Sequence, residues 1–117
     1  MFLQLAYKNL DLYNLSKKMV IACYELTQYL PEENTNQIKL QLRASALSAY
    51  IHIVRGLFRK SKKKRKEYLK IALRSLSEVD SYLELLFQTK HIRREQMDEI
   101  ENSLLPCYQL LKKLMKN

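Results

Sequence analysis

The sequence has very few of the residues that build turns. Its 117 residues include one glycine and two prolines, whereas leucine, lysine and other helix-favouring residues predominate. Glycine and proline punctuate turns and loops, so their scarcity argues against a fold with many short elements. We therefore expect an all-α chain, and its length fits a single domain spanning residues 1–117.

Long apolar runs and closely spaced cysteines are also missing. No apolar run approaches the roughly 20 residues needed to cross a bilayer, although 47% of the residues are hydrophobic. The two cysteines, Cys23 and Cys107, have neither the number nor the spacing of a disulfide framework or a zinc site. The first residues lack the features of a secretory signal. We expect a cytoplasmic protein with reduced thiols and no membrane partner.

The motifs of common enzyme sites are absent. Phosphate-binding loops, dinucleotide-binding loops and nucleophile elbows need glycines that this chain lacks. The only histidines, His52 and His91, lie far apart in the sequence without other metal-binding residues at ligand spacing. The Glu-x-x-His element of di-iron bundles is missing too. The sequence therefore predicts no catalytic residue, no metal site and no cofactor.

Apolar residues recur at spacings of three and four in four segments, as they do in amphipathic helices. This spacing predicts helices over about residues 9–29, 33–58, 62–89 and 94–115. Short connections favour an antiparallel up-down-up-down four-helix bundle. The predicted core stripes of the first, third and fourth helices are Leu12, Leu15, Met19, Ala22, Leu26 and Tyr29; Leu69, Ala72, Leu76, Val79, Leu83 and Leu86; and Met97, Ile100, Leu104, Cys107, Leu111 and Leu114.

The second predicted helix is apolar on two sides. One bundle buries only one apolar stripe of a helix, so the second stripe needs another partner. We interpret this pattern as a sign of self-association; the alternative is a central helix in a compact monomer. The two stripes are Leu40, Ala44, Leu47, Ile51, Val54 and Phe58, and Leu42, Ala46, Ala49, Ile53 and Leu57.

The net charge is +9, and one segment carries all of it. Residues 55–74 contain ten basic residues and one acid, Glu67, whereas the rest of the chain contains 11 basic and 11 acidic residues. A concentrated cationic surface is typical of proteins that bind a polyanion. The candidate nucleic-acid-binding residues are Arg55, Arg59, Lys60, Lys62, Lys63, Lys64, Arg65, Lys66, Lys70 and Arg74.

The placement of these cations favours phosphate binding. Ser61 is a suitable N-cap for the third helix, which puts residues 62–64 in a first turn where the macrodipole disfavours each exposed cation by about 0.3–1 kcal/mol. Residues 63, 66, 70 and 74 then form one cationic ridge along the helix. Contacts between these cations and the phosphates of a nucleic acid are sensitive to salt and independent of base sequence. The alternatives are a solvated helix face, an anionic membrane or an acidic protein.

Three aromatic residues border the basic segment: Tyr50, Phe58 and Tyr68. Aromatic side chains stack on the bases of single strands, which would add to phosphate binding. Aromatic residues at helical spacing belong more often to a core, however. Tyr68 is our candidate for a stacking residue.

Residues 42–48 (LRASALS), Gly56, residues 59–63 (RKSKK) and residues 68–79 (YLKIALRSLSEV) carry a family resemblance. The chain resembles the four-helix-bundle family that includes proteins encoded within intervening sequences of bacterial 23S ribosomal RNA genes and the accessory variability proteins of diversity-generating retroelements. The resemblance implies a homopentameric barrel that binds RNA or DNA on a basic surface. For retroelement members it also implies association with a reverse transcriptase and its template RNA during mutagenic complementary-DNA synthesis.

This chain departs from the family pattern inside the basic segment and just before it. Tyr50, His52 and Arg55 stand where the family tends to have proline, asparagine and glutamate, and Lys64 and Arg65 replace an acidic and an aromatic residue. These changes make the segment more basic. They favour a nucleic-acid-binding accessory protein; the alternative is a scaffold of the ribosomal intervening-sequence type whose basic surface binds an acidic protein.

Overall fold

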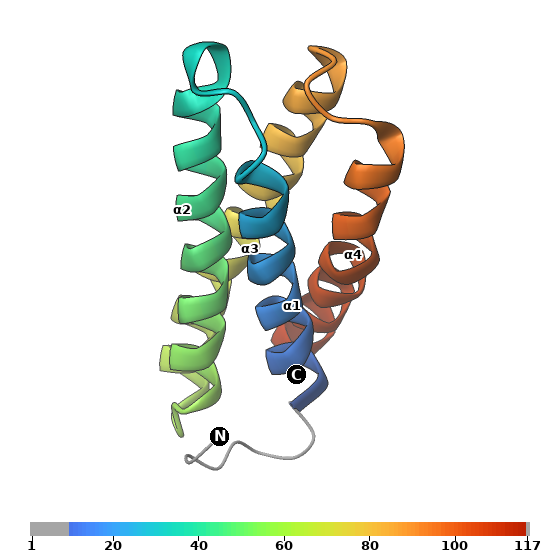
Figure 1. Ribbon diagram of the computed structural model, residues 1–117. Helices are drawn as coiled ribbons and strands as arrows, with labels where there is room; N and C mark the ends of the chain where they lie inside the picture. The colour runs from blue at the N-terminus through green and yellow to red at the C-terminus, as the bar shows by residue number, and fades with distance from the viewer. Residues whose placement is uncertain (1–9, 117) are drawn as a thin grey trace.

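The computed structural model describes residues 10–116, which form a four-helix bundle (Figure 1). The helices are α1 (Leu10–Thr27), α2 (Glu32–Leu57), α3 (Lys62–Gln88) and α4 (Arg94–Lys116). The expected all-α class is confirmed for this part of the chain. The expected start of the first helix at Asn9 lies outside the described residues.

The helices pack in a closed ring of neighbours. Helix α2 contacts α1 and, most extensively, α3, and α4 contacts α1 and α3. The connections α1–α2 and α3–α4 lie at one end of the molecule, and the α2–α3 connection and the end of α4 lie at the other (Figure 1). We call the second of these the α2–α3 end. The bundle measures 45 × 24 × 21 Å, so the two ends are well separated.

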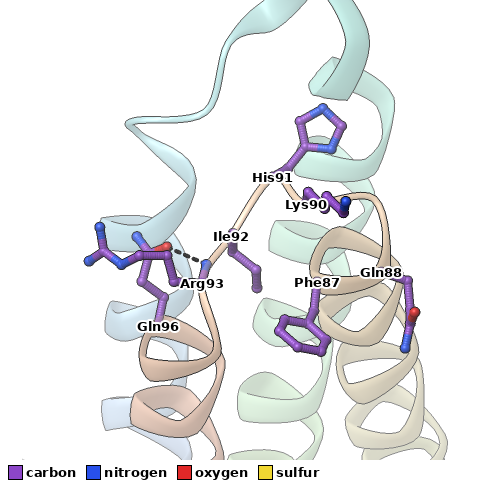
Figure 2. Close-up of a pocket in the computed structure, with 7 residues that line it drawn as sticks. All are labelled: Phe87, Gln88, Lys90, His91, Ile92, Arg93 and Gln96. Carbon is purple, nitrogen blue, oxygen red and sulfur yellow. Dashed lines mark hydrogen bonds between the residues drawn. The ribbon is translucent and has the colours of Figure 1, made fainter.

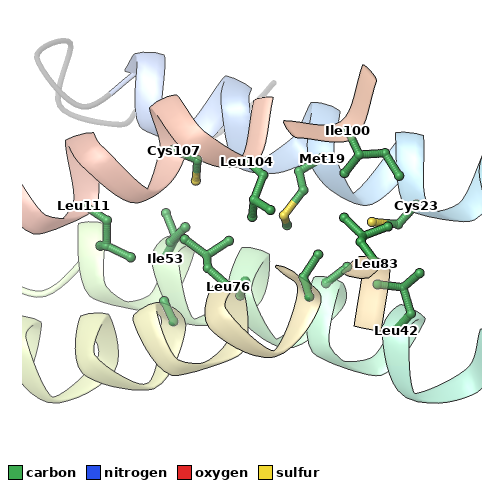
Figure 3. Close-up of a cluster of buried hydrophobic side chains, with 14 of the residues drawn as sticks. Met19, Cys23, Leu42, Ile53, Leu76, Leu83, Ile100, Leu104, Cys107 and Leu111 are labelled. Carbon is green, nitrogen blue, oxygen red and sulfur yellow. The ribbon is translucent and has the colours of Figure 1, made fainter. Parts of the chain in front are cut away.

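The predicted stripes of α3 and α4 supply much of the core. Every predicted core position of α3 is buried, and on α4 only Leu114 remains half-buried. Met19, Leu42, Leu83 and Ile100 bring all four helices together in one apolar cluster (Figure 3). Complete burial of one such side chain contributes about 1.5–3 kcal/mol. The heptad-like spacing therefore gave the correct inward face of these two helices.

The first helix departs from its predicted stripe. Tyr29, expected in the core, is 81% exposed because α1 ends at Thr27, two residues earlier than expected. Ser16 and Thr27 are buried instead. Their hydroxyl groups donate to the backbone carbonyls of Tyr13 and Cys23, both at 2.8 Å. Because these bonds satisfy the hydroxyls, the inward face of α1 includes polar residues that an apolar pattern does not reveal.

The two apolar stripes of α2 have different environments. The stripe from Leu42 to Leu57 is buried against the other helices. On the other stripe, Leu40 and Leu47 are 54% and 43% exposed. The bundle therefore buries the first stripe completely, whereas the second is exposed at Leu40, Ala44, Leu47 and Phe58 and half-buried at Ile51 and Val54. We call this second stripe the outward stripe.

Gly56 brings the end of α2 close to α3. A Cβ atom at this position would lie 2.8 Å from Cδ2 of Leu69 and 3.4 Å from the backbone oxygen of Arg65. Leu69 is completely buried and has little room to move aside. Glycine is therefore required here for the close approach of the two helices, and this approach fixes the α2–α3 end.

We predict that Gly56→Val lowers the free energy of unfolding by about 1–3 kcal/mol, because the added side chain overpacks the contact with Leu69. Denaturant unfolding measures the change. Leu85→Val, at a position of α3 that is 45% exposed, is the control, with an expected change below about 0.5 kcal/mol. Equal unfolding midpoints for Gly56→Val and the parent would contradict the close approach.

The two cysteines lie in the core as free thiols (Figure 3). Burial raises the pKa of Cys23 and of Cys107 from 9.0 to about 12. Each thiol therefore stays protonated at neutral pH and behaves as a small apolar group.

We predict that a thiol reagent at neutral pH modifies neither cysteine until the protein unfolds. The two thiols also make stability depend on pH. Because the pKa of each thiol is higher in the folded state, its contribution to the free energy of unfolding is complete below pH 9.0 and is lost as the pH rises toward 12. We predict that urea midpoints fall across this pH range, and that they fall less steeply in a Cys23→Ala/Cys107→Ala variant. Rapid labelling of the folded protein would show that the thiols are accessible.

Candidate nucleic-acid interface

The α2–α3 connection is short and internally bonded. Phe58 follows the last residue of α2 and donates its backbone N–H to the Val54 carbonyl at 3.2 Å. The N–H of Arg59 donates to Gly56 at 3.1 Å. At the other side, the Ser61 hydroxyl accepts from the N–H of Lys64 at 3.3 Å and caps α3. The local bonds therefore hold the start of the basic segment in one conformation.

The structure places all ten candidate residues at this connection or on adjoining turns of α2 and α3. Nine of them are exposed, and only Arg65 is half-buried. In the described part of the chain, the one carboxylate that pairs with any of them is that of Glu67, 3.7 Å from Lys64 Nζ. The segment thus forms a cationic surface with little internal neutralisation. We call these ten residues the basic patch.

Arg65 differs from the other members of the basic patch. Its guanidinium donates to the backbone carbonyl of Arg59 at 3.1 Å, which ties the first turn of α3 to the connection. Its Nε atom is buried and has no hydrogen-bond partner in the structure. Arg65 therefore braces the connection and presents less of its charge outward than its neighbours do.

The first turn of α3 contains three lysines and no acid. The unpaired N–H groups of a helix N-terminus carry partial positive charge, so cations there repel it by about 0.3–1 kcal/mol each. The same turn attracts anions, because its unpaired N–H groups, the helix dipole and the lysines all contribute positive charge there. A bound phosphate group would relieve a repulsion that the isolated chain retains.

Two of the three aromatic residues near the basic patch are engaged by other side chains. The ring of Tyr50 lies 5.9 Å from that of Tyr13, and its hydroxyl donates to the Tyr13 hydroxyl at 3.4 Å. Tyr68, our candidate for stacking, carries the guanidinium of Arg59 at 5.1 Å from its ring centroid and accepts a hydrogen bond from it at 3.2 Å. His52 lies 6.3 Å from the same ring.

The C-terminal turns of α4 bring further cations to the α2–α3 end (Figure 1). Lys112, Lys113 and Lys116 are exposed there. The charge pattern of the sequence does not reveal them, because they lie 38 to 42 positions after Arg74 and because the residues outside 55–74 are neutral in sum. The up-down-up-down order of the helices does indicate these lysines, because it places the end of the fourth helix at the same end of the bundle as the connection between the second and third.

Acidic residues lie mainly toward the opposite end. Four of them occupy the first turns of α4: Glu95, Asp98, Glu99 and Glu101. Burial, together with the carboxylates of Asp80, Asp98 and Glu84, raises the pKa of Glu101 above its ordinary value. The charges of the bundle are thus separated along its long axis.

The α3–α4 connection lies at the end of the bundle opposite the basic patch (Figure 1) and borders a cavity (Figure 2). The cavity is lined by the end of α3, the connection and the first turn of α4, including Phe87, His91 and Gln96. The Gln96 side chain accepts the backbone N–H of Arg93 at 2.8 Å (Figure 2). These contacts cap α4 and shape the turn.

The histidines take part in local hydrogen bonds. Nδ1 of His52 lies 2.7 Å from the Ser48 carbonyl oxygen, and Nδ1 of His91 lies 2.8 Å from the Thr89 hydroxyl. Across residues 10–116, no three residues of the histidine, cysteine, aspartate and glutamate types converge as metal ligands. Over the same residues, none of the helices combines the length and apolarity that a membrane crossing demands.

Comparison with known proteins agrees with this architecture. A crystal structure from Bacteroides thetaiotaomicron, described as a protein with unknown function from the S23 ribosomal protein family, has a TM-score of 0.80 and 25% sequence identity to this chain. The match covers 91% of this chain and 99% of that one. No curated protein matches the chain. The family model of the 23S rRNA-intervening sequence protein matches residues 8–113. The chain belongs to this family, as the resemblance of its second and third helices indicated.

Proposed function

We propose that this protein is a non-catalytic nucleic-acid-binding oligomer whose basic patch contacts the phosphates of RNA or DNA. The observation that carries the proposal is the exposure of nine cations around one helix junction with one carboxylate paired among them. Each phosphate contact releases counterions, so such a surface gains affinity from every lysine or arginine that reaches the backbone.

The geometry of the patch fits a polyanion better than a single small anion. The ridge of residues 63, 66, 70 and 74 extends over about 16 Å at the rise of an α-helix. Lys112, Lys113 and Lys116 are exposed on the last turns of α4, which ends at the same end of the bundle as the α2–α3 connection. A long phosphate backbone can contact cations from α2, α3 and α4 together.

A more specific role follows from the resemblance to retroelement accessory proteins. In this role the bound nucleic acid is template RNA, or its hybrid with complementary DNA, held for a partner reverse transcriptase during mutagenic synthesis. Arg55 and Lys64 support it, because both are exposed cations where the family tends to have acids. The second candidate is a scaffold whose basic patch binds an acidic protein, and the same cationic exposure favours that function.

We further propose that copies of the chain assemble through α1 and α2, as a homopentameric barrel of antiparallel bundles. The outward stripe of α2 supports assembly, together with Ile21 and Tyr24 of α1, which are also exposed. A hollow of about 390 Å³ lies between them, lined by both helices. Contiguous apolar surface of this kind is typical of interfaces. A ring of copies would repeat the basic patch and add avidity.

We predict that the parent protein binds short RNA and DNA with an affinity that falls steeply as salt rises. A variant with Lys62, Lys63, Lys66 and Lys70 replaced by glutamine should bind more weakly, and its log–log salt dependence should be shallower by about one for each lost phosphate contact. Fluorescence anisotropy at several salt concentrations measures both quantities.

The matched control for this experiment removes the same charge elsewhere. Lys39, Lys90, Arg93 and Arg94 lie near the other end of the bundle, and their replacement by glutamine should leave most of the affinity intact. The proposal fails if the patch variant binds RNA and DNA as tightly as the parent.

For the assembly, we predict by light scattering a mass near five times the 14.0 kDa of one chain. Leu47→Glu should reduce the mass toward that of one chain, because it puts a charge in the outward stripe of α2 without disturbing the core. Leu105→Glu, at an exposed apolar position of α4, is the control. A parent mass near 14.0 kDa at micromolar concentration would contradict self-association.

A further inference from the structure

Phe58 is the aromatic residue that the basic patch leaves open. The side chains of Tyr50 and Tyr68 are engaged by Tyr13 and by Arg59, as described above. Phe58, in contrast, is 41% exposed, and within residues 10–116 no aromatic ring or cation stacks on it. The sequence favours Tyr68 for stacking, whereas in the structure Phe58 is the more exposed of the two rings.

The backbone at Phe58 is fixed. Its N–H is bonded to the Val54 carbonyl, and the next N–H is bonded to Gly56. Gly56 in turn is held against Leu69 of α3. The main chain that carries the partly exposed ring is therefore fixed, and binding to the ring would require little ordering of the backbone.

Cations surround Phe58 in the chain. Arg59 and Lys60 follow it directly, Arg55 lies one helical turn before it, and the lysines of the first turn of α3 begin four residues later. All of these side chains are exposed. An exposed aromatic ring among cations combines the two elements that bind single strands, a face for a base and charges for the flanking phosphates.

We propose that Phe58 is a base-stacking residue and that the basic patch binds single-stranded nucleic acid in preference to a duplex. This inference rests on the proposed nucleic-acid-binding function and deepens it. Phosphate contacts alone do not distinguish the two forms by their bases, whereas an aromatic ring does. In a duplex each base is already stacked on its neighbours, so only an unpaired base offers a free face to Phe58.

Another copy of the chain is the alternative partner for the exposed ring, because Phe58 belongs to the outward stripe of α2. Charge favours nucleic acid. Each copy of the chain carries a net charge of +9, so a second copy is less favoured beside Arg59 and Lys60 than a polyanion, which is attracted to both. The stripe nearer the other end of α2, around Leu40 and Leu47, lacks such a concentration of cations.

The absence of tryptophan from the chain allows a direct test. Phe58→Trp introduces a single indole whose fluorescence is quenched when a base stacks on it. Titration with a short single-stranded oligonucleotide should quench this emission along the same curve as the anisotropy, and the matched duplex should not. Tyr29→Trp, at an exposed position beyond the end of α1 and away from the basic patch, is the control and should remain unquenched.

Affinity gives the second readout. Phe58→Leu keeps an apolar side chain but removes the aromatic face, and it should weaken single-strand binding about fivefold or more while leaving duplex binding unchanged. Equal single-strand affinity of Phe58→Leu and the parent would overturn the inference. So would tryptophan emission at position 58 that responds to protein concentration but not to nucleic acid, since a second copy would then cover the ring.

Comparison of the four-lysine variant with Phe58→Leu distinguishes failure of base stacking from failure of nucleic-acid binding. If the four-lysine variant loses affinity for both forms but Phe58→Leu binds both as the parent does, phosphate binding stands and base stacking fails. If the four-lysine variant binds both forms normally, the nucleic-acid-binding function itself fails, and the stacking inference fails with it.

Discussion

The close approach of α2 to α3 at Gly56 is the constraint on which the placement of the basic patch depends. Without a side chain at this position, Leu69 fills the space between the helices and the connection can be only a few residues long. Bonds from Phe58, Arg59 and Ser61 then fix the connection. The backbone that carries the cations is therefore fixed, and core packing sets the positions of their Cα atoms relative to one another.

Electrostatics opposes this arrangement in the isolated chain. Neighbouring cations repel one another and also repel the positive end of the α3 dipole, and Glu67 pairs with only one of them. Acids that would neutralise the patch lie mainly on α4 and the later part of α3, toward the opposite end. A fold selected for its own stability alone would mix these charges. Their separation makes sense if a polyanionic ligand supplies the missing negative charge.

The sequence was a good guide wherever apolar spacing decided the structure. Helices α3 and α4 have uninterrupted spacings, and their predicted inward positions are almost all buried. Apolar spacing predicted α1 less well, because Ser16 and Thr27 are buried without being apolar. Their hydroxyls donate hydrogen bonds to backbone carbonyls of the same helix, which allows both residues to lie in the core. The two stripes of α2 could be recognised but not ranked, since only packing decides which one faces α3. The lysines of α4 and the accessibility of Phe58 depend on tertiary arrangement, which a linear pattern does not contain.

NMR mapping of the backbone amides during titration with single-stranded RNA shows where on the bundle nucleic acid binds. If nucleic acid binds at the basic patch, the perturbed amides will cluster in residues 55–74 and in the last turns of α4, and the α3–α4 connection will be unaffected. Perturbations centred on residues 87–101, or spread along the outward stripe of α2, would contradict it.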